Sequence, residues 1–272
     1  MRKQAKTEQP LLKFSKPNSK IAFPSFSIPA GWTCPGAWNC LTKRDRKTGK
    51  IIDLQKPDAL GLTYRCYATS LEVAYPALGK LLDYNEKLLR GLDYEKDLVA
   101  LILNSLKHNQ WTRGLYHGGG ALRVHIHGDF FKYLYLKAWF SVAQFLPHIR
   151  FYSYTKSLLF LKRYKEEVGD FPSNYFLTWS RGSKFDSLGA SLGIKSVTLV
   201  KGEEEAKALG LEIDHDDLLA LNGKKDFALE PHGGQPKGHP LGKIIAQKRK
   251  AGKFAGYNKK TSFGPIFPPF SI

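Results

Sequence analysis

The stretch RFYSYTKSLLFLKRYKEEVGDFPSNYFLTW (150–179) contains the pattern of a strand, a helix and a second strand in direct succession. Residues 150–154 and 174–179 are rich in aromatic residues, as expected of strands. Between them, apolar residues over 158–168 recur at helical spacing. Two strands joined by a helix form a parallel pair in one sheet, so this stretch predicts an α/β fold.

The same alternation continues on both sides of this stretch. We expect further strands at 21–30 (broken by Pro24), 123–127, 195–200 and 226–229, and helices at 67–92 (interrupted at Pro76), 98–106, 130–145, 203–209 and 241–250. These elements predict a partial (β/α) barrel of about six parallel strands with flanking helices. The expected organisation is a flexible basic arm at 1–20, a single α/β domain at 21–255 with a cysteine loop at 31–66, and an extended tail at 256–272.

The composition of the 272 residues indicates a soluble protein with an anionic partner. The chain has 42 Lys and Arg against 24 Asp and Glu, a formal net charge of +18. Such an excess favours nucleic acid or another polyanion as partner. No apolar run is long enough to cross a membrane, and the start lacks a secretory pattern, so we expect a cytoplasmic location. The pattern gives no indication of the oligomeric state.

Polar residues follow nearly every predicted strand. His127 and Asp129 follow the second strand, Lys156 the third and Arg181 the fourth, while an acidic group at 214–217 and His232 follow the later ones. Active sites of parallel α/β folds gather where strands end at their carboxyl edge. His127, Asp129, Lys156 and Arg181 are therefore the candidate catalytic residues, with the two cations available for a phosphate or carboxylate unless Arg181 pairs with Asp186.

Three cysteines, Cys34, Cys40 and Cys66, are an odd count that does not fit a disulfide framework. Their spacing does not match a zinc ribbon, which uses paired Cys-x2-Cys motifs. Thiolates are suited to iron–sulfur clusters and to zinc. Three thiolates on a 4Fe-4S cluster leave one iron open for a substrate or S-adenosylmethionine. The alternative is zinc held by three cysteines and His125, His127 or His232.

His125 and His127 are two residues apart. If 123–127 is a strand, both side chains lie on one face and can meet one divalent metal. With a nearby tyrosine, such a pair is typical of metal-dependent nickases of single-stranded DNA. The alternative is that His125 packs in the core and only His127 reaches the edge of the sheet.

Several motifs resemble the "gene product 88" family of phages and plasmids. They are PAGWTCPGA (29–37), YRCYA (64–68), HIHGDFF (125–131), YTKSL (154–158) and LTWSRG (177–182). In that family the second histidine position is often serine, which argues against a paired-histidine site. The same blocks are distantly similar to radical S-adenosylmethionine proteins, although the usual Cys-x3-Cys-x2-Cys is absent and 25 residues separate Cys40 from Cys66. This second resemblance implies a partial (β/α) barrel that binds an iron–sulfur cluster after its first strand.

The leading hypothesis is therefore an iron–sulfur barrel protein, an enzyme acting on a nucleic acid or another anionic substrate. One alternative is a basic nucleic-acid-binding protein with a structural zinc. The other is a metal-dependent nickase that uses His125 and His127.

Overall fold

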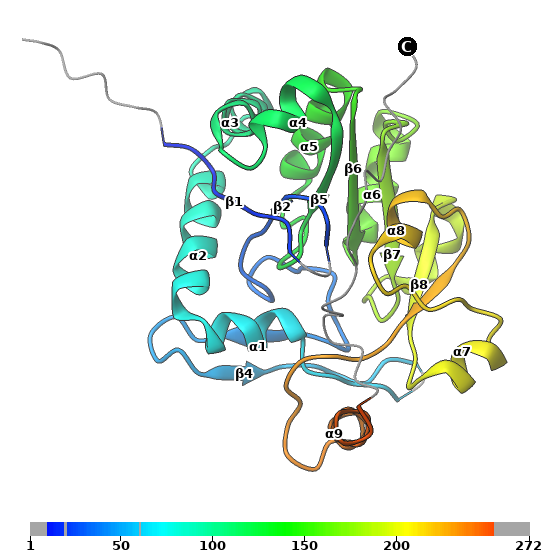
Figure 1. Cartoon of the computed structure of the whole chain (residues 1–272). Coiled ribbons are helices and arrows are strands. Elements are labelled where there is room, and N and C mark those ends of the chain that lie inside the picture. Colours follow the sequence, from blue (N-terminus) through cyan, green and yellow to red (C-terminus); the bar gives the residue numbers. More distant parts are fainter. Residues whose placement is uncertain (1–9, 19–20, 60, 253–272) are drawn as a thin grey trace, which may run out of the picture.

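The computed structural model describes residues 10–18, 21–59 and 61–252 of the chain. Seven strands form one sheet, in the order β1-β2-β5-β6-β7-β8-β9 (Figure 1). β1 is antiparallel to β2, and all other neighbours in this sheet are parallel. Six parallel strands thus follow one another in chain order, and the predicted partial (β/α) fold of about six parallel strands with flanking helices is confirmed. The strands are β1 Phe14–Ser15, β2 Ser25–Phe26, β3 Thr42–Arg44, β4 Ile51–Asp53, β5 Gly120–Val124, β6 Ile149–Thr155, β7 Tyr175–Ser180, β8 Lys195–Leu199 and β9 Phe227–Leu229.

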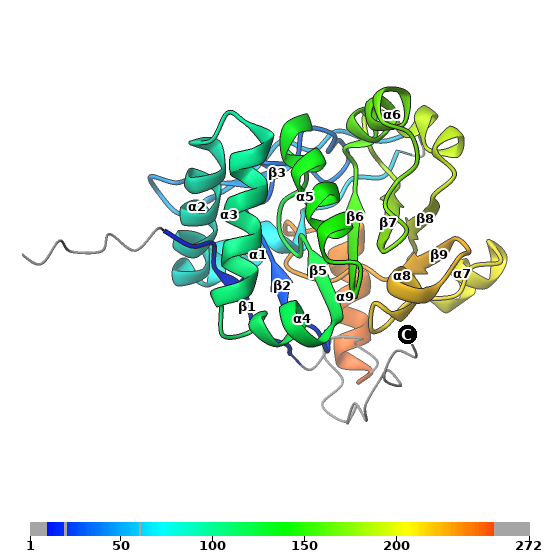
Figure 2. The same ribbon diagram turned by 90° about the horizontal axis from the view of Figure 1, so that it is seen from above.

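The helices flank this sheet, with α3 and α5 packed against each other (Figure 2). Predicted helix 67–92 is divided at Pro76, as expected, because proline lacks the N–H that would continue the hydrogen bonding of the helix. The helices are α1 Tyr67–Ala74, α2 Pro76–Arg90, α3 Glu95–His108, α4 Arg113–Gly118, α5 Tyr133–Phe145, α6 Leu158–Glu167, α7 Glu203–Ala208, α8 Leu218–Asn222 and α9 Pro240–Lys250, with 3-10 turns at Asp186–Leu188 and Ala190–Leu192.

Alternate residues of each strand face opposite sides of the sheet. On the outer side, Phe151 and Tyr175 are paired across β6 and β7, and their rings stack 5.9 Å apart. They belong to the main core, in which Trp139 of α5 is fully buried. The strands and helices were predicted from these aromatic residues, and the same residues pack the outer helices against the sheet.

The inner side is partly filled by a loop and a short helix that the sequence did not predict. α8 contacts β6 and β7. Ala220 and Leu221 of α8 pack in a second core with Ala121, Tyr152 and Val197, which face inward from three strands.

The cysteine loop (31–66) has secondary structure that the sequence analysis missed. β3 and β4 form an antiparallel hairpin within it, with Thr42 opposite Asp53. Arg44 of β3 is buried, and its guanidinium forms an ion pair with Asp83 of α2 at 2.6 Å. The loop is therefore a folded insertion anchored on α2.

The structure also differs from the sequence prediction at two other places. β5 ends at Val124, so residues 125–127 are not a strand, and His125 has a left-handed backbone with φ of 71°. Within the predicted arm, Leu12 and Phe14 are buried, and Phe14 belongs to β1. The remainder of the arm (1–9, 19–20) and the predicted tail (256–272) lie outside the described residues.

Candidate functional site

The three cysteines lie near one another at the carboxyl edge of the sheet. Cys34 and Cys40 belong to the insertion that follows β2, and Cys66 directly precedes α1. All three are free thiols and partly exposed. Burial raises the pKa of the Cys34 thiol, and the nearby carboxylate of Asp129 raises it further. The N–H of Tyr64 donates to the carbonyl of Asn39 at 2.9 Å, so the chain beside Cys40 lies against the chain that leads to Cys66.

Each sulfur also has a local hydrogen-bond donor. The N–H of Gly31 donates to Sγ of Cys34 at 3.3 Å. The N–H groups of Ala68 and Thr69, in the first turn of α1, donate to Cys66. Donors of this kind, together with the positive end of the helix dipole, favour a thiolate over a thiol.

Cys40 and Cys66 are additionally fixed by neighbouring side chains. The hydroxyl of Tyr64 donates to Cys40. The N–H of Cys66 donates to Oγ1 of Thr42 at 3.2 Å, and the hydroxyl of Thr69 donates to the carbonyl of Thr42 at 2.9 Å. β3 of the insertion and the start of α1 are thereby held together at Cys66. Burial nevertheless raises the pKa of Cys66 to about 12, so a bound cation is what would keep its thiolate at neutral pH.

Within residues 10–18, 21–59 and 61–252, no three or more His, Cys, Asp or Glu side chains converge on one point that a metal ion could occupy. A zinc ion needs its ligands about 2.0–2.3 Å from a single centre. An iron–sulfur cluster binds each thiolate through a different iron, so its cysteines need not converge. Cys34, Cys40 and Cys66 thus do not form a single-ion site in this arrangement.

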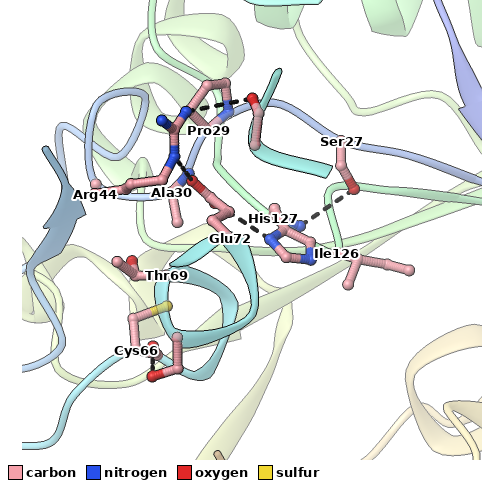
Figure 3. Close-up of polar contacts among 12 residues, drawn as sticks. Ser27, Pro29, Ala30, Arg44, Cys66, Thr69, Glu72, Ile126 and His127 are labelled. Atoms are coloured by element: carbon pink, nitrogen blue, oxygen red, sulfur yellow. Dashed lines mark hydrogen bonds and ion pairs between the residues drawn. The ribbon is translucent and has the colours of Figure 1, made fainter. Parts of the chain in front are cut away.

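Glu72 and His127 form a carboxylate–histidine pair close to Cys66 (Figure 3). Glu72 lies six residues after Cys66 and is fully buried. Its Oε1 accepts from Nδ1 of His127 at 3.2 Å and from the N–H of Ala30 at 2.8 Å, while Nε of Arg44 is 3.8 Å from Oε2. A carboxylate only accepts hydrogen bonds, so Nδ1 carries the proton and Nε2 is the basic nitrogen. Sequence reasoning missed Glu72, although it is the only charged residue of α1, and that was the available signal.

His125 points away from His127. Its Nε2 is 2.9 Å from the hydroxyl of Tyr135, and its ring packs against Phe130 with centroids 4.8 Å apart. Burial lowers the pKa of His125 to about 3, so it is neutral at physiological pH. Of the two interpretations of this pair, the structure agrees with the second, in which His125 packs in the core, because β5 ends before both histidines and a left-handed residue turns the chain.

Asp129 joins the ends of two strands. Its Oδ1 accepts from the N–H of Phe130 and the hydroxyl of Thr155, both at 2.7 Å, and its Oδ2 accepts from the N–H of Lys156 at 2.8 Å. Burial raises its pKa to about 6 in spite of these donors. With both oxygens engaged, Asp129 holds the loop after β5 to the end of β6, and its charge faces Cys34.

The two predicted cations have different surroundings. Nζ of Lys156 is buried and donates to the carbonyl oxygens of Ser180, at 2.9 Å, and Arg181. Arg181 is half-exposed, and its Nε donates to the hydroxyl of Ser196 at 3.2 Å. Its NH2 group is 3.7 Å from Asp226. Lys156 therefore braces β7, whereas Arg181 presents a guanidinium to solvent at the carboxyl edge.

Asp186, the alternative partner of Arg181, has a different role. Its carboxylate accepts from the N–H groups of Gly182 and Ser183 at 2.7 and 2.9 Å, and from Nε1 of Trp179 at 2.9 Å. These bonds shape the turn after β7, and they leave Arg181 to Asp226.

The acidic group at 214–217 faces the inner side of the sheet. Asp217 forms an ion pair at 2.5 Å with Arg123, and both are buried. The hydroxyls of Tyr152 and Tyr154 each donate to Asp217 at 3.2 Å. The charge of Asp217 is thus neutralised by an arginine.

Tyr67 connects this inner wall to the cysteines. Its hydroxyl donates to the carbonyl of Ile126 at 2.9 Å and is 3.5 Å from NH2 of Arg123. Its ring packs on that of His232, with centroids 4.3 Å apart. Tyr67 therefore links the start of α1, directly after Cys66, to the inner side of the sheet.

Comparison with known proteins gives one match. The sequence model of the family described as "Gene product 88" matches residues 1–255. Neither the curated proteins nor the solved structures contain a match. In the part of the chain that the structure describes, the helices are too short or too polar to cross a membrane.

Proposed function

We propose that this chain, which belongs to the gene product 88 family, binds an iron–sulfur cluster through Cys34, Cys40 and Cys66. The family name states no reaction, and the proposal is drawn from the geometry of the carboxyl edge. The main support is that hydrogen bonds hold the cysteine-bearing loop to the start of α1 and to the turn after β7, at the edge of a parallel sheet where ligands bind. The hydrogen bonds to each sulfur add to this support, since such bonds stabilise cluster thiolates.

Three protein thiolates would leave one iron of a 4Fe-4S cluster without a protein ligand. That iron supplies a position for a substrate group or for S-adenosylmethionine, which is the second part of the proposal. The distant resemblance of the sequence motifs to radical S-adenosylmethionine proteins motivates only this second part of the proposal.

The surrounding side chains have distinct tasks in such a site. His127 offers Nε2 as a proton acceptor, because Glu72 holds the proton on Nδ1. The half-exposed guanidinium of Arg181 binds an anionic group of the substrate, as arginines do with phosphates and carboxylates. Asp129 and Lys156 hold the strand ends in place and do not contact the substrate themselves. We therefore propose an enzyme that acts on a nucleic acid or another anionic substrate.

Anaerobic purification with iron, sulfide and zinc analysis tests the cofactor. We expect a brown protein with about four irons and four sulfides per chain and an absorption band in the visible range. A Cys66→Ala variant should lose this iron. Ser191→Ala is the control, because Ser191 is exposed and its hydroxyl donates to the carbonyl of Leu188.

The opposite result is equally clear. One zinc per chain without iron, or iron that remains in the Cys66→Ala variant, would overturn the cluster. If the cluster is present, adding S-adenosylmethionine to the reduced protein should change its electron paramagnetic resonance spectrum, and an unchanged spectrum would exclude that ligand.

A further inference from the structure

Two segments that are far apart in sequence concentrate the positive charge of the described chain. Residues 31–66 contain seven Lys or Arg against three Asp, and residues 230–252 contain five Lys or Arg against one Glu. All other described residues together contain 23 Lys or Arg against 19 Asp or Glu. Most of the excess therefore lies in these two segments, which both lie at the lower end of the molecule in Figure 1.

The two segments meet directly beside Cys66. The N–H of Arg65 donates to Oε1 of Gln235 at 2.9 Å, and Nε2 of Gln235 donates back to the carbonyl of Arg65 at 3.0 Å. The hydroxyl of Ser70 donates to the carbonyl of Gly234 at 3.2 Å. The end of the first segment and the beginning of the second are thus joined at the start of α1, next to Cys66.

The hairpin is fixed at its base and cationic at its tip. Arg44 is buried in ion pairs with Glu72 and Asp83, and Arg65 is paired with Asp53. At the tip, Lys47 and Lys50 are exposed. Charges on a rigid support bind a polyanion with less loss of conformational entropy than charges on a loose loop.

α9 presents its cations in the same manner. Leu241 and Ile245 are buried and attach the helix, whereas Lys243 and Lys250 are exposed. Lys248 is neutralised by Glu230, so it does not contribute to the free positive charge.

From this placement we propose that the hairpin and α9 form one nucleic-acid-binding surface, which holds a phosphodiester backbone across the entrance of the cysteine site. Separated lysines on two rigid elements suit a repeating row of phosphates, and each contact releases counterions. The inference deepens the proposed function by naming its substrate class, but the binding itself does not depend on a cluster.

Fluorescence anisotropy with labelled 25-nucleotide single-stranded DNA, RNA of the same sequence and the DNA duplex tests this surface. The variant Lys47→Gln/Lys50→Gln/Lys243→Gln should bind the preferred probe about tenfold more weakly at 0.1 M salt. The slope of the logarithm of the binding constant against the logarithm of the salt concentration should become less negative by about 0.7–0.9 for each lysine that contacts a phosphate. The control variant Lys80→Gln/Lys87→Gln/Lys107→Gln removes the same charge from exposed positions of α2 and α3 and should bind within about twofold of the wild type.

Equal weakening in both variants would overturn the surface, because it would show that only total charge matters. Absence of binding to all three probes at low salt, or stronger binding to vesicles of phosphatidylserine and phosphatidylcholine, would also overturn it. The same assay on Cys66→Ala separates the two proposals. If Cys66→Ala binds the probe although it contains no iron, the surface acts independently of the cluster. If the wild type binds the probe but contains no iron, the result counts only against the cofactor.

Discussion

The outer face and the carboxyl edge of the parallel sheet are built in different ways. On the outer face, Phe151, Tyr175 and Trp139 come from regular strands and a helix and form a continuous apolar core. At the carboxyl edge, Cys34, Glu72 and His127 come from an insertion, a short helix and a turn. The first region is stabilised by burial of apolar area. The second depends on a few hydrogen bonds and ion pairs, so single substitutions there should change the site more than the fold.

The inner side of the sheet (the inner wall) has features of both regions. It is buried like the outer face, but its side chains are polar like those of the carboxyl edge. Replacing Arg123 by Met should lower the free energy of unfolding by about 3–5 kcal/mol, since it leaves the carboxylate of Asp217 buried without its cation. Urea denaturation followed by circular dichroism measures this change.

A double variant decides whether the loss comes from the unpaired charge. Asp217 has φ of 66°, a conformation that asparagine tolerates well, so Asp217→Asn removes the charge and keeps the backbone. Arg123→Met/Asp217→Asn should recover at least half of the lost stability. If the double variant is as unstable as Arg123→Met, the ion pair is not the cause, and the inner wall behaves like an ordinary core.

His125 is the exception within the outer region, a titratable ring among Phe26, Phe130 and Tyr135. Its folded pKa of about 3 lies below the usual 6.5, so the unfolded chain takes up a proton first as pH falls. Stability contributed by neutral His125 is therefore present above pH 6.5 and is lost between pH 6.5 and 3.

The pH dependence of His125→Asn measures this loss. Between pH 7 and pH 5, the wild type should lose about 2 kcal/mol more unfolding free energy than the variant. Asn suits the left-handed backbone at this position, and all other titrating groups are common to both proteins. The same pH dependence in both proteins would mean that His125 is already protonated or accessible in the fold.

The contrast also explains which features could be predicted from the sequence. Strands β6 to β8 and helices α5 and α6 followed from apolar spacing, because burial on the outer face selects that spacing. The alternation continued through Val124-His-Ile-His127, yet the chain turns there, because a single left-handed residue does not alter the apolar pattern. The hairpin β3–β4 was missed since its residues are mostly polar and charged, with ion pairs in place of a core.

The candidate site was predicted in its location but not in its partnerships. The cysteines, His127 and Arg181 lie at the carboxyl edge, as the rule for parallel sheets predicts. Which groups pair with them is decided by contacts between residues distant in sequence, such as Glu72 with His127 and Arg181 with Asp226. Spacing along the chain contains no information on such contacts, and for that reason Glu72 was found only in the structure.

Glu72→Gln tests the edge with the smallest expected change in stability, about 1 kcal/mol. The amide oxygen of Gln can take the place of Oε1 and still accept from both the N–H of Ala30 and Nδ1 of His127, because one oxygen receives both bonds, and the NH2 group then faces Arg44. Nitrogen-15 NMR of the imidazole should therefore show protonated Nδ1 in the wild type and in Glu72→Gln, whereas Glu72→Met, which has no acceptor for Nδ1, should show protonated Nε2. Glu86→Gln is the matched control, because Glu86 is a buried glutamate of α2 that pairs with Arg46 and Arg90 and forms no bond with His127 in the structure. Protonated Nδ1 in Glu72→Met as well would show that Glu72 supports the fold without orienting His127, and the edge would then be held together in the same way as the core.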